Sequence, residues 1–189
     1  MAYHFIGEPG DTCTVTYRDL HRMVCRFTNA MKRAGLQPGD SAVIYMPMVP
    51  ELPAALLACA RLGVVHSVVF GGFSAEALRF RVEDLEASIV ITADGGWRRG
   101  KEVRLKDTVD EALSEGCATV KNVVVLKRTN SQVPMKAGRD VFWNDFVYQL
   151  TLNQRVVGWQ QCLHGPPVSP SGMLEGRPLP SGDSPAFIP

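Results

Sequence analysis

Two short segments of the sequence combine residue types that could bind a phosphate-bearing ligand. The first, VVFGGFSAEALRFR, places Gly71 and Gly72 between an apolar, strand-like run and a run with helical spacing. The second, GGWRRGKE, carries three cations within four residues, Arg98, Arg99 and Lys101. Adjacent glycines allow a ligand to approach the backbone, and free N–H groups at a helix start can meet an anion. Arginine and lysine side chains suit a phosphate.

Each segment also has a plainer interpretation. Glycine-rich turns between a strand and a helix are common in α/β domains, and a surface run of cations is usually just solvated. Neither segment is a standard nucleotide motif. The first lacks G-x-G-x-x-G, and the second matches G-x-x-x-x-G-K but has Glu102 where a P-loop needs Ser or Thr to bind magnesium. A P-loop phosphotransferase is therefore rejected.

The elements that must position these segments alternate along the chain. The first helix is expected from Tyr17 to Ala34, with Thr16 as its N-cap, Asp19 in its first turn and Gly35 as its stop. Apolar runs rich in Val and Ile predict strands at 41–46, 64–70, 88–93 and 121–127. Helices are expected at 51–63, at 75–86 after a Ser74 cap, and at 108–115 after an Asp107 cap, with 103–107 non-helical.

This alternation predicts an α/β fold with a mostly parallel sheet flanked by helices. Strands that are apolar throughout are typical of a sheet covered on both faces. Ligands bind such sheets beyond the carboxyl ends of the strands. The segment from Phe70 to Ser74 follows one predicted strand, and the cationic segment follows another, so both are expected at that end.

Composition excludes several classes of protein. A hydrophobic fraction of 46%, a charged fraction of 21% and a net charge of +1 predict a globular chain without a field that favours nucleic acid or an acidic membrane. The five cysteines form no CxxC pair, and the four histidines have no metal-ligand spacing. We therefore expect reduced, buried thiols, no metal site, no membrane span, no secretory signal and a cytoplasmic location, with a mitochondrial one left open.

The character of the sequence changes after about residue 150. Between Gly165 and Pro189, 11 of 25 residues are Pro or Gly, and four more are Ser. Such a segment buries too little apolar surface to offset the entropy lost on ordering. We therefore predict a folded domain over residues 5–150 and a largely disordered tail over residues 151–189.

A longer series of motifs resembles a known family. From about Phe5 to Val147 the chain reads, in order, AVIYMPMVPE, LLACARLGVVHSVVFGGFSAEAL, IVITADGGWRRGK, LKDTVDEAL and VVVLKRT. Together these runs resemble the acetyl-CoA synthetases, the AMP-forming acetate–CoA ligases of the adenylate-forming superfamily. The fold implied is part of the N-terminal domain of such an enzyme. The pattern leaves acetyl and propionyl substrates open.

The resemblance implies an activity and a binding site. Family members join acetate and ATP, with Mg2+, into acetyl-adenylate and diphosphate, and CoA then attacks the adenylate to give acetyl-CoA and AMP. The loop matching Phe70, Gly71 and Gly72 lies against the CoA adenine in the family, with the Phe70 ring available to stack on it. The segment matching Arg98, Arg99, Gly100 and Lys101 contacts the CoA phosphates. Family members more often have a small residue where Arg99 stands and Arg where Lys101 stands, so Lys101 lacks the bidentate fork of arginine.

The chain departs from the family after Leu150. The Ser/Thr/Gly-rich ATP loop of the type YTSGSTGxPKG, the acetate pocket and the C-terminal lysine that aids adenylation have no counterparts in the sequence. We therefore expect no catalytic residue and no ATP–Mg2+ site in this chain. Two functions compete, an acetate–CoA ligase by family and an inactive truncated product that is at most a weak binder of the CoA nucleotide.

Overall fold

The computed structural model describes residues 1–148, so the predicted tail lies outside the described residues. Nine strands and five helices alternate through that range. They are β1 (Tyr3–Ile6), β2 (Thr12–Val15), α1 (Tyr17–Arg33), β3 (Ser41–Tyr45), α2 (Glu51–Leu62), β4 (Val65–Val68), α3 (Ala75–Asp84), β5 (Ile89–Ala93), β6 (Gly96–Arg98), β7 (Lys101–Val103), α4 (Leu105–Ala112), β8 (Asn122–Leu126), β9 (Asp140–Phe142) and α5 (Trp143–Tyr148).

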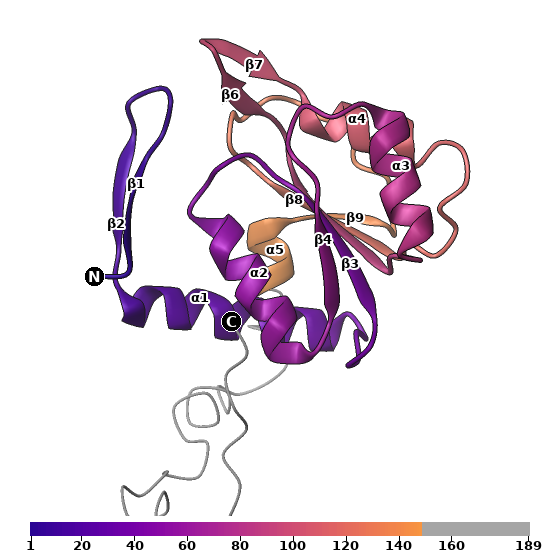
Figure 1. The fold of residues 1–189 in the computed structure, drawn as a ribbon, viewed down its shortest axis with the longest axis horizontal. Coiled ribbons are helices and arrows are strands. Elements are labelled where there is room, and N and C mark those ends of the chain that lie inside the picture. The colour runs from indigo at the N-terminus through magenta and orange to yellow at the C-terminus, as the bar shows by residue number, and fades with distance from the viewer. Residues whose placement is uncertain (149–189) are drawn as a thin grey trace, which may run out of the picture. The chain divides into compact units, whose positions relative to one another are not determined.

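The centre of the domain is a five-stranded sheet in the order β4-β3-β5-β8-β9, with every neighbouring pair parallel. Helices α1, α2 and α5 cover one face, and α3 and α4 cover the other (Figure 1). Because both faces are covered, consecutive residues of one strand, such as Val43 and Ile44 of β3, are both 0% exposed. The predicted α/β fold with a parallel sheet flanked by helices is confirmed.

The ends of the predicted helices follow their capping residues. Thr16 and Asp19 form a reciprocal capping box at the start of α1, and the Ser74 hydroxyl accepts the Ala77 N–H at the start of α3. Gly63 ends α2 in the left-handed conformation, with φ of 79°. These caps are local, which is why the sequence alone located them.

One predicted helix begins in the wrong place. Residues 103–107 were expected to be non-helical and Asp107 to cap a helix at 108–115, yet α4 starts at Leu105 and its N-cap is Arg104. Asp107 instead lies in the first turn, where its carboxylate pairs with the Arg104 guanidinium at 3.2 Å. The early start is a tertiary effect, because it buries Leu105 and Lys106 against the sheet at 1% and 0% exposure.

Six further elements were not predicted. β1 pairs with β2, and β6 pairs with β7, as short antiparallel hairpins, while β9 and α5 complete the sheet edge and one helical layer. These strands have three or four residues, too few for a clear period-2 pattern, and unlike β4 they do not lie within a longer run rich in Val. Helix α5 is held by tertiary packing, since the Trp143 ring stacks on the Phe27 ring of α1 at a centroid distance of 4.2 Å.

The described cysteines are Cys13, Cys25, Cys59 and Cys117, and all four are free thiols, as expected. The expectation that they are buried holds for Cys25 and Cys59. It is wrong for Cys13, which is exposed on a hairpin strand, and for Cys117, which is only partly buried. Cys162 lies outside the described residues. Within residues 1–148, no helix combines the length and apolar character needed to cross a bilayer.

A buried ion-pair network ties β9 to the helical layer above it. The Lys106 ammonium is 0% exposed and lies 2.9 Å from the Asp140 carboxylate, which is also 0% exposed, and 2.6 Å from Asp110. Arg139 bridges both carboxylates, at 2.5 Å from Asp140 and 2.7 Å from Asp110. Two cations and two anions therefore balance, and the charges are compensated where water is excluded.

We predict that Asp140→Asn destabilises the domain in a pH-dependent way. Burial alone would raise the pKa of Asp140, but the hydrogen bonds from Arg139 and Lys106 hold that pKa below its ordinary value. A lowered folded-state pKa means that the carboxylate stabilises the fold above the unfolded value of about 3.9. This contribution is lost as pH falls through the folded value. Urea unfolding at pH 7 should show a loss of about 3 kcal/mol, since one partner of a buried pair is removed.

The loss should shrink as the pH falls below the unfolded value of about 3.9, because the unfolded wild-type chain then takes up a proton that the folded carboxylate does not. Asp145→Asn, at an exposed position on α5, is the matched control and should change stability by less than about 0.5 kcal/mol. A destabilisation by Asp140→Asn that is equal at pH 7 and pH 3 would contradict the ionic role of this network.

Candidate functional site

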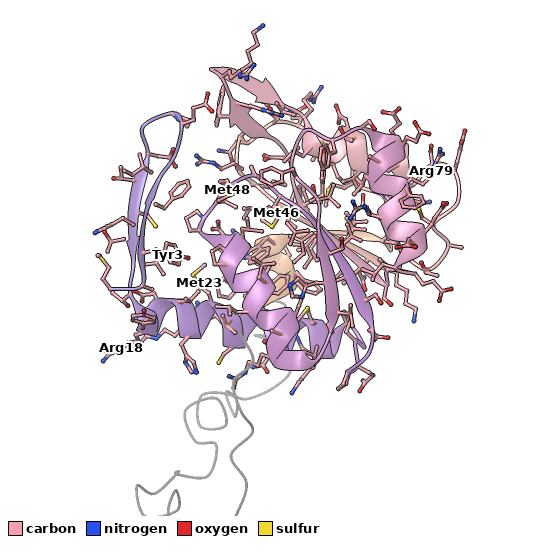
Figure 2. All side chains as sticks on the ribbon, in the orientation of Figure 1. Tyr3, Arg18, Met23, Met46, Met48 and Arg79 are labelled. Atoms are coloured by element: carbon pink, nitrogen blue, oxygen red, sulfur yellow. The ribbon has the colours of Figure 1, made fainter. Side chains whose placement is uncertain are left out.

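A cavity of about 590 Å³ opens beyond the carboxyl ends of the parallel strands. Its walls come from the segment after β3 (Met46–Met48), the turn after β4 (Phe70 and Gly71), the start of the β6–β7 hairpin after β5 (Gly96–Arg98) and Arg128 after β8. The turn of the β1–β2 hairpin adds Ile6, Gly7 and Glu8. In Figure 2, Met46 and Met48 lie just past the end of β3, on the side toward the β1–β2 hairpin.

This position follows from the topology of the sheet. The chain leaves β3 through α2 to reach β4 on one side, and leaves β5 through α4 to reach β8 on the other. The two neighbouring strands thus send their connections in opposite directions and across opposite faces. A crevice forms between such connections, and α/β proteins commonly bind ligands there. The backbones at this point approach closely, because a Cβ on Gly96 would stand 2.8 Å from the Pro47 Cβ.

The predicted glycine turn lies at this crevice. Phe70 is 73% exposed at the cavity edge, which leaves its ring free to stack on a ligand. Gly72 has φ of 113°, a conformation that L side chains rarely adopt. Gly71 is different, because a Cβ there would make only ordinary contacts, at 3.4 Å from the Met46 carbonyl oxygen and the Leu105 side chain. The fold therefore demands a glycine at position 72 but not at position 71.

The predicted cationic segment is the β6–β7 hairpin. Arg99 and Gly100 form its two-residue turn, both with positive φ, at 53° and 73°. Arg98 and Lys101 occupy directly opposed positions in the hairpin register, so two like charges face each other across the strands. Such a pair is unfavourable by itself, and an anion placed beside it would relieve the repulsion.

The structure brings the two predicted segments together. A Cβ placed on Gly72 would lie 2.6 Å from the Arg98 Nη1 atom, so the guanidinium packs directly against the glycine backbone. Arg98, Phe70 and Gly71 line the same cavity. Arg99, Gly100 and Lys101 are exposed at the hairpin tip and are not part of the cavity wall.

The cations of this hairpin differ from the other cation of the cavity. Within residues 1–148, no ion pair involves Arg98, Arg99 or Lys101. Arg128, by contrast, donates to both carboxylate oxygens of Asp11 at 2.7 and 2.8 Å, and these bonds raise the pKa of its guanidinium. Arg128 is therefore neutralised within the fold, whereas the three hairpin cations are not paired in the described part of the chain.

One acidic side chain lies close to the hairpin turn. The Glu8 carboxylate of the β1–β2 hairpin accepts the Gly100 N–H. This contact holds the two hairpins together at the rim of the cavity. It also takes up a backbone donor of the positive-φ turn, so an anion bound to that N–H must displace the carboxylate. The side chains of Arg98 and Lys101 stay available without any such displacement.

Sequence reasoning missed the residue that anchors this hairpin. Asp94, at the end of β5, is 0% exposed, and its Oδ1 atom accepts the N–H groups of Gly95 and Arg128 at 2.7 Å and of Thr129 at 3.0 Å. It thereby ties the start of the hairpin to the loop after β8. The available signal was a lone Asp directly after an apolar strand, which is a common place for a backbone-capping carboxylate.

The segment from Gly95 to Glu102 does not fold as a P-loop. Instead of a loop that enters a helix, it forms most of the β6–β7 hairpin, and the Glu102 carboxylate accepts the hydroxyls of Thr129 and Ser131. The described residues contain no cluster of three or more His, Cys, Asp or Glu able to hold a metal. Burial raises the pKa of the Cys59 thiol to about 12, so this group is not a nucleophile at neutral pH.

Comparison with known proteins identifies relatives of this chain. The model of the AMP-binding enzyme family matches residues 1–189. The acetyl-coenzyme A synthetase of Pasteurella multocida is 53% identical over 150 residues, which cover 79% of this chain and 22% of that protein. The acetyl-coenzyme A synthetase of Methanothrix thermoacetophila is 51% identical over 148 residues, or 78% of this chain and 22% of that protein.

A solved structure shows the same fold. The acetoacetyl-CoA synthetase from Streptomyces lividans superposes with a TM-score of 0.70 at 28% identity, over 77% of this chain and 22% of that one. The chain belongs to the AMP-binding enzyme family. Within that family, its similarity to acetyl-CoA synthetases confirms the resemblance that the sequence motifs indicated. The chain spans about a fifth of the length of these relatives.

We predict that the two glycines of the turn respond differently to the same substitution. Gly72→Ala should destabilise the domain by about 1–2 kcal/mol. The turn would hold an L residue at a positive φ, and the new methyl group would displace the Arg98 guanidinium. Gly71→Ala should stay within about 0.5 kcal/mol of the wild type, since its Cβ meets only ordinary contacts. Urea unfolding of the three proteins measures both values. Equal losses at the two positions would contradict the conformational role given to Gly72.

Proposed function

We propose that the cavity is the CoA-nucleotide part of an acetyl-CoA synthetase site. One observation carries the proposal. The Arg98 guanidinium, which forms no ion pair within residues 1–148, packs on the Gly72 backbone, at the edge of a cavity that Phe70 also lines. A nucleotide with a terminal phosphate needs such a pair of features side by side, a platform for a flat base and a cation for the phosphate. Here two segments that lie 26 residues apart in the sequence supply them.

The roles of the individual residues follow from their positions. Phe70 is free to stack on the adenine ring, and Gly71 lets the ring approach the backbone without meeting a side chain. Arg98 donates to phosphate oxygens, and Arg99 and Lys101 at the hairpin tip add attraction that salt would screen. The reaction partners proposed for the complete family enzyme are acetate, ATP with Mg2+, and CoA.

A second function is favoured for the 189-residue chain taken by itself. The sequence contains no Ser/Thr/Gly-rich ATP loop, and the described residues contain no cluster of three or more His, Cys, Asp or Glu that could hold a metal. We propose that this chain binds the CoA nucleotide weakly and does not catalyse adenylation. Its free thiols suit a reducing compartment, and we propose the cytoplasm.

We predict that the 189-residue chain does not adenylate acetate. Adenylation requires hydrogen-bond donors and magnesium around the triphosphate of ATP. A chain without them leaves the negative charge of the triphosphate unstabilised. The measurement is acetate-dependent exchange of labelled diphosphate into ATP, with a complete acetyl-CoA synthetase as the positive control. Exchange that stays with the purified chain through successive columns and depends on acetate would overturn the proposed inactivity.

We predict that Arg98→Ala weakens CoA binding and removes the preference for the 3′-phosphate. Because Arg98 is exposed, we expect a loss of about 1 kcal/mol, or roughly fivefold, in a titration followed by NMR or calorimetry. The ratio of the affinities for CoA and 3′-dephospho-CoA should fall toward one. Arg81→Ala, at an exposed arginine in the last turn of α3, is the matched control and should leave this ratio unchanged.

Gly71→Ala tests the base platform in the same titration. It is expected to fold normally, so a loss of affinity for both ligands would report the approach of the adenine rather than damage to the domain. An Arg98→Ala protein that binds CoA and dephospho-CoA just as the wild type does would identify the hairpin cations as surface charge.

A further inference from the structure

The last residue of β3, Tyr45, contacts the glycine turn with its hydroxyl group. Its ring is 0% exposed in the core of the domain. The hydroxyl oxygen accepts the Gly72 N–H at 3.0 Å, and the same hydroxyl donates to the Phe73 carbonyl oxygen at 2.9 Å. A single side-chain group from a neighbouring strand therefore satisfies a donor and an acceptor of one turn.

The turn has few other restraints. Phe70 and Phe73 are 73% and 53% exposed, and one internal hydrogen bond, from the Phe73 N–H to the Phe70 carbonyl oxygen at 3.1 Å, closes the turn. Glycine pairs have wide conformational freedom, so such a turn would sample many shapes if it were held only at its ends. The Tyr45 hydroxyl is fixed by a buried ring with few rotatable bonds. The strand thus imposes one conformation on the turn.

This conformation is the one that places Gly72 against the Arg98 guanidinium and Phe70 at the cavity edge. Tyr45 does not line the cavity, so it acts through the turn. We propose that Tyr45 is a positioning residue of the nucleotide site, whose hydroxyl holds the 70–73 turn ready to receive the base. The inference rests on the proposed function, because it concerns how that same site is organised.

The test is Tyr45→Phe in the full 189-residue chain, which removes the hydroxyl and keeps the buried ring. Because two hydrogen bonds are lost, we expect both CoA and 3′-dephospho-CoA to bind about 5- to 30-fold more weakly. The ratio of the two affinities should stay at the wild-type value, because Arg98 is still present. This pattern differs from Arg98→Ala, which is expected to change the ratio.

A second readout reports the turn itself. Hydrogen exchange of the Gly72 amide should become at least about tenfold faster in Tyr45→Phe, since that N–H loses its acceptor. The matched control is Tyr148→Phe, which removes a hydroxyl that accepts from Arg26 on an element that lines no part of the cavity. It should change neither the affinities nor the Gly72 exchange. Binding is compared at a temperature at which circular dichroism shows all proteins folded.

The possible results distinguish a failure of the Tyr45 positioning role from a failure of the proposed nucleotide site. If the wild type binds CoA and Tyr45→Phe binds it equally well, the positioning role is overturned and the nucleotide site stands. The role is also overturned if Gly72 exchange is unchanged, because the hydroxyl then does not hold the turn. If the wild type binds neither ligand, the proposed nucleotide site fails, and the positioning role fails with it.

Discussion

The parallel pairing of β3 with β5 at the centre of the sheet is the constraint on which the rest of the domain depends. Their register aligns Tyr45 with Thr92, so the two strands end within one residue of the same level. From that level the connections diverge, α2 over one face and α4 over the other. The crevice between them exists because the chain cannot cover both faces of the sheet without separating these two connections.

Some charged side chains of the described residues form ion pairs within the fold, whereas the cations of the β6–β7 hairpin do not. The buried cations and anions around Lys106 and Asp140 compensate one another, and Arg128 is matched by Asp11. At the hairpin, the opposed pair of Arg98 and Lys101 has no ion-pair partner within the part of the chain that the structure describes. Uncompensated like charges cost stability, and they persist most readily where a ligand supplies the opposite charge. The contrast separates Arg128, which holds the fold, from the hairpin arginines, for which we propose a role in binding phosphate.

The two adjacent glycines of the turn look alike in the sequence, but each is needed for a different reason. At Gly72 the fold itself needs the missing side chain, because φ is positive and Arg98 lies on the backbone. At Gly71 the chain's own atoms would tolerate a methyl group, so the proposed adenine platform explains that glycine better than the fold does. Tyr45 then fixes the shape of a turn that its own residues leave undetermined.

The sequence by itself determined what depends on near neighbours. Apolar runs predicted strands β3, β4, β5 and β8, and the caps at Thr16, Ser74 and Gly63 predicted helix ends, because those interactions span a few residues. Motif resemblance identified the family and both segments of the candidate site. Only the tertiary structure decided that α4 starts at Leu105 and that residues 96–103 form a hairpin. It alone revealed the roles of Asp94 and Tyr45, because burial and hydrogen bonds between residues 27 to 35 positions apart leave no periodic signal in a sequence.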